Sequence, residues 1–154
     1  MSQPIPRMAL WLGLAGLLPM VWGVAETYIP AVKLILDGKT DGWYYAPYST
    51  MRYAEIILCF MSGVLWGFAA RAPAATAGMG YALSVLPALY VFFFVNGTIN
   101  DIAIKLAIGF ALVLCIDALF HAQKLTPEWW MRLRYILSAG MVVCLLLLGW
   151  VDHR

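Results

Sequence analysis

Charged side chains occur in pairs four residues apart inside otherwise apolar sequence. Asp101 and Lys105 form one pair, and Asp117 and His121 form another. Residues four apart lie on one face of a helix, where opposite charges can form an ion pair. Because ionisable side chains inside apolar segments are costly, those that do occur there are candidates for functional groups.

The first expected polar cluster gathers acidic and basic residues near one membrane surface. Arg52 lies one helical turn before Glu55 on the second apolar segment, while Asp101 and Lys105 begin the fourth. Both segments start from the same side of the membrane, and Glu26 follows the first segment on that side. We therefore expect Glu26, Arg52, Glu55, Asp101 and Lys105 to lie close together.

The second expected cluster lies at the opposite ends of these segments. Asp117 and His121 close the fourth segment, and Arg132 and Arg134 open the fifth at the same level. A lone carboxylate in hydrocarbon is expensive, and an arginine partner stabilises it. We expect Asp117 to pair with Arg132 or Arg134.

Three interpretations of both clusters stay open. The charged groups can pair between helices to set their register, they can line a proton or ion path, or they can bind a lipid headgroup or another ligand. A relay across the membrane needs polar groups at mid-depth. The sequence offers only Cys59, Ser62, Ser84 and Ser138 there, and none of them titrates near neutral pH without special help, which argues against a pump.

The composition defines the elements that must position these residues. Of the 154 residues 64% are hydrophobic and 12% are charged, against about 25% charged in soluble domains. Mean hydropathy is +0.83. Apolar stretches of about 18 residues or more are long enough to cross a bilayer, and backbone in lipid must satisfy its own hydrogen bonds as helix. We predict an all-α integral membrane protein.

The apolar blocks predict a bundle of five transmembrane helices within one multi-pass membrane domain, residues 1–154. The first block is interpreted as a retained span, because Glu26 and Tyr28 replace the small residues of a signal-peptide cleavage site. Pro19 and Pro87 should each kink a span. The predicted spans are residues 8–25, 48–70, 77–95, 102–120 and 129–151.

Small residues predict where helices approach one another. Gly63 and Gly67 form a GxxxG motif on the second span, and Trp66 lies between them to fill an adjacent groove. GxxxG motifs let two helix backbones come close together in a membrane. We therefore expect this face to be a helix-packing surface.

The connection between the first two spans is long. We expect a short interfacial helix over residues 31–36, a polar turn over residues 37–42 and an aromatic cluster over residues 43–48. Aromatic side chains of this kind are typical of the headgroup level of a membrane. A ligand-binding aromatic lid is the alternative interpretation.

Several functional classes are disfavoured. The formal charge of +2 and the absence of any run of Lys or Arg argue against nucleic acid. The sequence has no CxxC motif, no His/Cys cluster, no nucleophile–base pair and no phosphate-binding Gly-rich loop. We expect no catalytic residues, no bound metal and no cofactor, and the lipid bilayer as the surroundings.

Charge in the connections predicts orientation. Lys and Arg residues are equally frequent on the two sides, but the connection before the fifth span is short and strongly basic. Positively charged short connections stay in the cytoplasm. We therefore expect a cytoplasmic N-terminus and an external C-terminus.

Residues 53–67 resemble the second-helix signature of a small membrane family, catalogued as domain of unknown function 3429, with the mitochondrial transmembrane protein 69 as a relative. Residues 60–67 are the specific part. Residues 12–19, 81–87 and 127–134 and the lone Asp117 also match. The chain departs at Ser62, at Leu65, where histidine is common, and in its longer first connection. The resemblance implies a multi-pass protein of the bacterial inner membrane and implies no activity.

Two functions of different kinds follow from these observations. The first is a non-enzymatic accessory, assembly or stabilising partner of a larger membrane complex, suggested by small size, close-packing glycines and the mitochondrial relative. The second is a small ion- or proton-coupled transporter or channel, suggested by Glu55, Asp117 and the two prolines. A protein that binds a lipid or a tetrapyrrole through Trp66 and the aromatic connection is a further alternative.

Overall fold

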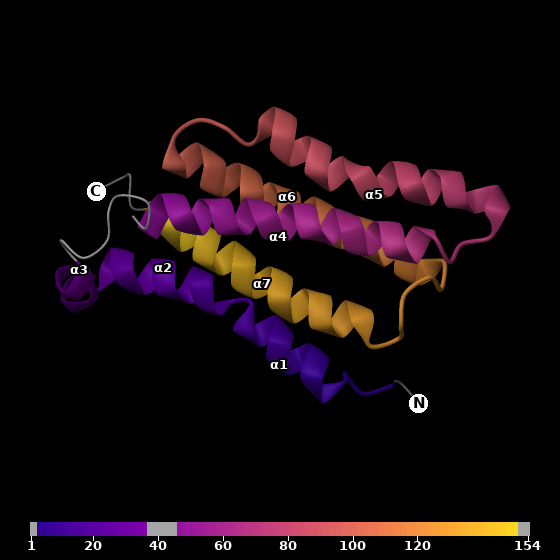
Figure 1. The fold of residues 1–154 in the computed structure, drawn as a ribbon, viewed down its shortest axis with the longest axis horizontal. Helices are drawn as coiled ribbons and strands as arrows, with labels where there is room; N and C mark the ends of the chain where they lie inside the picture. The colour runs from indigo at the N-terminus through magenta and orange to yellow at the C-terminus, as the bar shows by residue number, and fades with distance from the viewer. Residues whose placement is uncertain (1–2, 37–45, 151–154) are drawn as a thin grey trace.

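Long helices account for nearly all of the described chain (Figure 1). The computed structural model describes residues 3–36 and 46–150, and this part of the chain contains no strand. Five helices are long and apolar enough to cross a membrane, which confirms the predicted all-α bundle of five transmembrane helices. The elements are α1 (Arg7–Ala15), α2 (Leu18–Tyr28), α3 (Pro30–Leu36), α4 (Ala46–Ala69), α5 (Ala74–Phe94), α6 (Ile99–Ala122) and α7 (Trp130–Gly149).

The first span is broken near its middle. α1 ends at Ala15 and α2 begins at Leu18, with Pro19 in the first turn of α2. Proline is tolerated there because the first amides of a helix have no partner within the helix. Tyr53 on α4 donates its hydroxyl to the carbonyl of Gly16 at 2.6 Å. The kink expected at Pro19 is therefore a break between α1 and α2. The carbonyl of Gly16, exposed by this break, accepts its hydrogen bond from α4.

Pro87 lies inside α5 and disturbs its hydrogen bonding. The proline ring removes one donor and interferes with the bonds of the preceding turn. The amide of Ala88, the next residue, donates to Oγ of Ser62 on α4 at 2.9 Å. Ser62 is buried, so this bond joins α4 and α5 beside the proline, while α5 continues as a helix through it.

The core lies between α4, α6 and α7. Its largest buried side chains include Leu58 and Leu65 of α4, Phe110 of α6 and Leu145 of α7. α5 and the first span pack around these three helices (Figure 1). α5 also presents much of its length outward, and Phe92 is 78% exposed.

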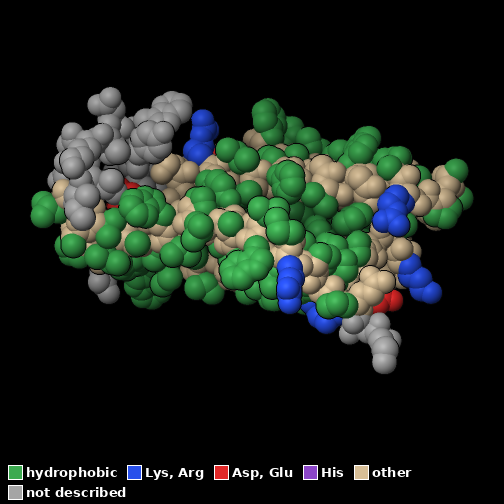
Figure 2. Space-filling view, turned by 60° about the horizontal axis from the view of Figure 1, so that its bottom comes forward, with side chains coloured by type: hydrophobic (Ala, Val, Ile, Leu, Met, Phe, Trp, Pro, Cys, Tyr) green, Lys and Arg blue, Asp and Glu red, His purple; other side chains and the backbone are tan. Residues whose placement is uncertain are grey.

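The outer surface is apolar over most of the bundle. Figure 2 shows hydrophobic side chains covering the visible face, with Lys and Arg toward its two ends. Soluble proteins rarely expose such large contiguous apolar areas. This distribution is what a helix bundle surrounded by lipid requires.

The connection after the first span begins with a short helix, as expected. α3 occupies Pro30–Leu36, one residue longer than the predicted segment. The polar turn at residues 37–42 and the aromatic residues 43–45 lie outside the described part of the chain.

Candidate functional site

A buried ion pair joins α6 to α7. Nε of Arg134 donates to Oδ2 of Asp117 at 2.7 Å, and Nε1 of Trp130 donates to Oδ1 at 2.8 Å. Asp117 is fully buried, and Arg134 is 4% exposed. Trp130 and Arg134 are four residues apart, so both project from the same face of α7 toward α6. Each carboxylate oxygen therefore has a donor, which removes the cost of an unpaired charge.

The arginine retains hydrogen-bonding capacity. Nη2 of Arg134 and Oγ of Ser138, one turn further along α7, are buried and bond to no other described residue. Ser138 is 4% exposed. These two groups extend the polar cluster from the helix end toward the interior of the bundle.

His121 contacts the α6–α7 connection, and Arg132 binds the segment that precedes α1. Nδ1 of His121 lies 2.8 Å from Oγ1 of Thr126, and Nη2 of Arg132 donates to the carbonyl of Gln3 at 2.5 Å. The sequence offered Arg132 and Arg134 equally as partners of Asp117, and in the structure Arg134 occupies that place. His121 contacts the α6–α7 connection instead of Asp117.

Asp101 and Lys105 do not pair with each other as expected. Asp101 accepts from the amide and hydroxyl of Thr98 in a capping box that starts α6. Nζ of Lys105 donates to the carbonyl of Asn96 at 2.6 Å and lies 3.4 Å from its Oδ1. The amide and hydroxyl donors of Thr98 offer Asp101 a nearer partner than Lys105 does, and the carbonyl of Asn96 offers Lys105 a nearer partner than Asp101 does.

The remaining members of the first cluster share one end of the bundle but not a contact. Figure 1 places the end of α2, the helix that carries Glu26, at the same end of the bundle as the starts of α4 and α6. Within the described residues, Glu26, Arg52 and Glu55 take part in no ion pair. Glu26 and Glu55 are half-buried and Arg52 is exposed. The expected cluster is therefore not joined by ion pairs within the described residues.

The GxxxG face of α4 points away from the bundle. A Cβ built on Gly63 or Gly67 would meet no atom within 4 Å, and both glycines are exposed. Trp66 is half exposed and rests against Tyr81 of α5, with ring centroids 4.5 Å apart. The expectation that these glycines bring spans of this bundle together is wrong for the described chain. α4 packs into the bundle through another face, which carries Leu58 and Leu65.

Other glycines provide the close approaches. A Cβ on Gly109 of α6 would lie 2.6 Å from Cδ2 of Leu58. One on Gly80 of α5 would lie 3.0 Å from the Cβ of Ala69. Sequence reasoning missed these positions, together with Trp130 and the role of Ser62 as an acceptor. Glycines spread singly along spans carry no motif, so only the packing identifies them.

The described residues contain no group of three His, Cys, Asp or Glu side chains that could hold a metal ion. The interactions that the site does contain are buried charge pairing and hydrogen bonding. An arrangement of this kind holds helices and connections in register.

The fold and its buried charge pair define a multi-pass helical membrane protein. The chain belongs to the family described as protein of unknown function (DUF3429), which it matches over residues 5–149. It is 32% identical over 146 residues to Transmembrane protein 69 of Xenopus tropicalis, covering 91% of this chain. The chain spans about half of that relative, 53% of its length. No solved structure matches.

Proposed function

We propose that this protein is a non-enzymatic accessory subunit that docks against a transmembrane helix of another membrane protein. The observation that carries the proposal is the open face of α4, formed by Cys59, Gly63 and Gly67. These residues are four apart and exposed, and no described atom comes within 4 Å of a Cβ built on either glycine. We name this surface the α4 face.

The physics of helix association in lipid supports this use of the α4 face. Lipid tails are as apolar as leucine, so helices associate through close packing more than through hydrophobic transfer. Glycines remove the side chains that would keep two backbones apart, and Trp66 provides a firm edge because it rests on Tyr81. A helix of a partner protein would pack against the α4 face more closely than lipid chains can.

The buried Asp117 and the exposed Asp101 both fit a structural role. Both carboxylate oxygens of Asp117 are taken by donors of α7, and Asp101 caps α6. A transporter or channel needs groups that change partners, and these two have their partners within the fold. The accessory role thus uses the bundle as a rigid body, and the α4 face as its contact.

We also propose a location in a bacterial inner membrane with the N-terminus in the cytoplasm. The short connection from α6 to α7 carries Lys124, and Arg132 and Arg134 follow in the first turns of α7. An excess of basic residues in a short connection favours the cytoplasmic side.

The test is mild-detergent purification of the tagged protein from its native membrane, with identification of what accompanies it. A stoichiometric membrane protein should accompany the wild type, and Gly63→Leu or Gly67→Leu should reduce its recovery by about tenfold or more, the effect of losing roughly 1.4 kcal/mol of contact. The melting temperature of either variant should equal that of the wild type, because the added side chain enters open space.

Gly78→Leu is the matched control. Gly78 on α5 also has nothing within 4 Å of a built Cβ, but it lies outside the α4 face, so the partner should be retained. Recovery of the wild type alone, or full retention of the partner by Gly63→Leu, would refute the accessory role.

A further inference from the structure

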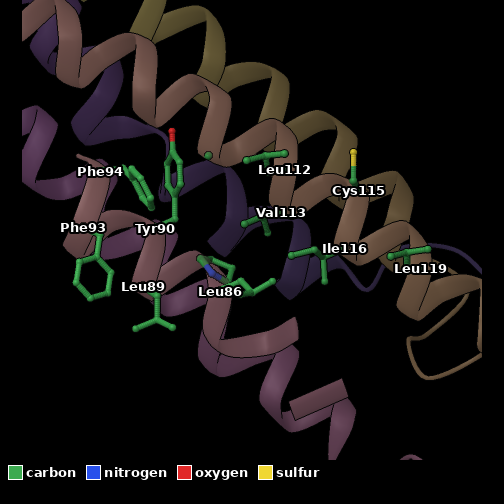
Figure 3. A pocket seen from close by; sticks show the side chains of 12 residues that line it. Leu86, Leu89, Tyr90, Phe93, Phe94, Leu112, Val113, Cys115, Ile116 and Leu119 are labelled. Atoms are coloured by element: carbon green, nitrogen blue, oxygen red, sulfur yellow. The ribbon is translucent and has the colours of Figure 1, made fainter. Parts of the chain in front are cut away.

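An apolar groove of about 460 Å³ opens between α5 and α6. Figure 3 shows Leu112, Cys115 and Leu119 following one another along α6 above the side chains of α5, with Tyr90, Phe93 and Phe94 gathered at one end. The lining residues of α6 extend from Gly109 to Leu119, ten helical steps apart, which correspond to about 15 Å along the helix axis. The groove is therefore elongated and runs along the direction in which the helices cross the membrane.

The floor of the groove is closed and its rim is open. Val113 is 1% exposed, and Gly109 and Pro87 are buried. Gly109 lacks a side chain to fill the space. Leu86, Leu112 and Leu119 are about half exposed at the rim. The groove lies between two helices that are long and apolar enough to span a membrane, so its opening faces hydrocarbon.

The positive charge of Lys105 lies near the aromatic end of the groove, outside its lining residues. The hydroxyl of Tyr90 donates to the carbonyl of Lys105 at 2.8 Å, and Lys105 precedes Gly109 by one turn on α6. Nζ of Lys105 bonds to Asn96, two residues beyond Phe94. An ammonium group has three donors. In the described part of the chain Asn96 takes two, so one can reach a further acceptor.

We propose that this groove holds one acyl chain of a phospholipid, with its phosphate accepting a hydrogen bond from Lys105. The length and apolar lining of the groove suit an extended hydrocarbon chain, and its volume falls within the range of small-molecule sites, about 300–1,000 Å³. Lys105 lies at the start of a span, the level at which a lipid phosphate meets the protein. Lysine side chains reach toward that level readily.

The headgroup must supply the selectivity. The acyl chain moves from the apolar bilayer into an apolar groove. This transfer therefore favours one lipid over another only weakly. Asp101 lies one turn before Lys105 and opposes a net negative charge, although its carboxylate is engaged with Thr98. The site therefore selects a phosphate as a hydrogen-bond acceptor rather than a strongly anionic headgroup. A diacylglycerol with the same chains lacks that acceptor.

The experiment is native mass spectrometry of the purified protein titrated with phosphatidylglycerol or with diacylglycerol of identical chains. One phosphatidylglycerol should remain bound per chain, with about tenfold preference over diacylglycerol, as expected for one charge-assisted hydrogen bond. Lys105→Met, which removes the donor but keeps an unbranched side chain, should abolish the preference while leaving chain binding in place. Equal retention of the two lipids by the wild type would overturn the proposal.

A second pair of variants tests the groove itself. Cys115→Trp fills it from α6, and Ile108→Trp adds the same bulk on an exposed position of α6 outside the lining. Cys115→Trp should lower the amount of bound lipid about tenfold, whereas Ile108→Trp should leave it unchanged. The melting temperatures of the two variants should be equal. Retention by Cys115→Trp equal to that of Ile108→Trp would overturn the site. If Cys115→Trp is unstable, Leu112→Trp serves the same purpose, and the Lys105 comparison stands independently of both.

Discussion

Single buried charges in this protein have well-defined partners. Asp117 receives one hydrogen bond from Arg134 and one from Trp130, both on α7. Arg132, two residues earlier on α7, projects in another direction and binds the carbonyl of Gln3. Two arginines that are equivalent by composition thus have different roles, because a helix rotates successive side chains by about 100°.

At the residue scale, Asp117→Leu should destabilise the fold strongly. Removing one partner of a buried pair costs about 3–5 kcal/mol because the other charge stays buried and unpaired. Adding Arg134→Leu should recover part of that loss, measured as the melting temperature or denaturation midpoint in detergent.

Arg132→Leu is the matched control for this pair. Added to Asp117→Leu it should recover nothing, because Arg132 does not contact the carboxylate. Equal recovery with the two arginine substitutions would contradict the assigned pairing.

At the scale of elements, closeness between helices depends on where each helix turns its glycines. α6 turns Gly109 against Leu58 of α4, and α5 turns Gly80 against Ala69. The GxxxG motif of α4 instead lies on the surface. The GxxxG motif is therefore available to a partner, while the close helix contacts within the bundle occur at Gly80 and Gly109, which belong to no motif.

Gly109→Leu should destabilise the isolated protein, and Gly63→Leu should not. A Cβ on Gly109 would lie 2.6 Å from Leu58 and 3.0 Å from the ring of Tyr90. Overpacking of this kind costs about 1–3 kcal/mol or more. The measurement is the denaturation midpoint of each purified variant. A larger loss for Gly63→Leu than for Gly109→Leu would show that the α4 face is covered within the chain.

At the scale of the whole molecule, the two ends of the bundle differ in how they hold charge. One end has Asp117, Arg134, His121 and Arg132 joined to helices and connections by hydrogen bonds. At the other end Asp101 and Lys105 are hydrogen-bonded to Thr98 and Asn96, but Glu26, Arg52 and Glu55 form no ion pair among the described residues. The proposed orientation places the first end in the cytoplasm.

Reporter fusions should test this orientation. A reporter active only outside the cytoplasm should give signal at the C-terminus and none in the connection at Lys124, because five spans place these points on opposite sides. The reverse pattern would invert the proposed topology. A reporter active only in the cytoplasm supplies the complementary control.

The number of spans and their approximate positions can be derived from the sequence alone. Insertion into hydrocarbon depends on the local composition of about 20 residues, so each span is encoded within its own segment. The break at Pro19 is also local, because proline lacks an amide donor. The need of Asp117 for an arginine follows from the cost of burying a lone charge.

The rotation of each helix about its axis was decided only by the tertiary structure. In a membrane the outward face meets lipid and the inward face meets other apolar side chains, so the hydrophobic pattern distinguishes them weakly. This is why the sequence could not tell that Gly63 faces outward, that Gly109 faces inward, or which of Arg132 and Arg134 meets Asp117. The groove beside Lys105 arises in the same way, from the spacing between α5 and α6 that packing against α4 imposes.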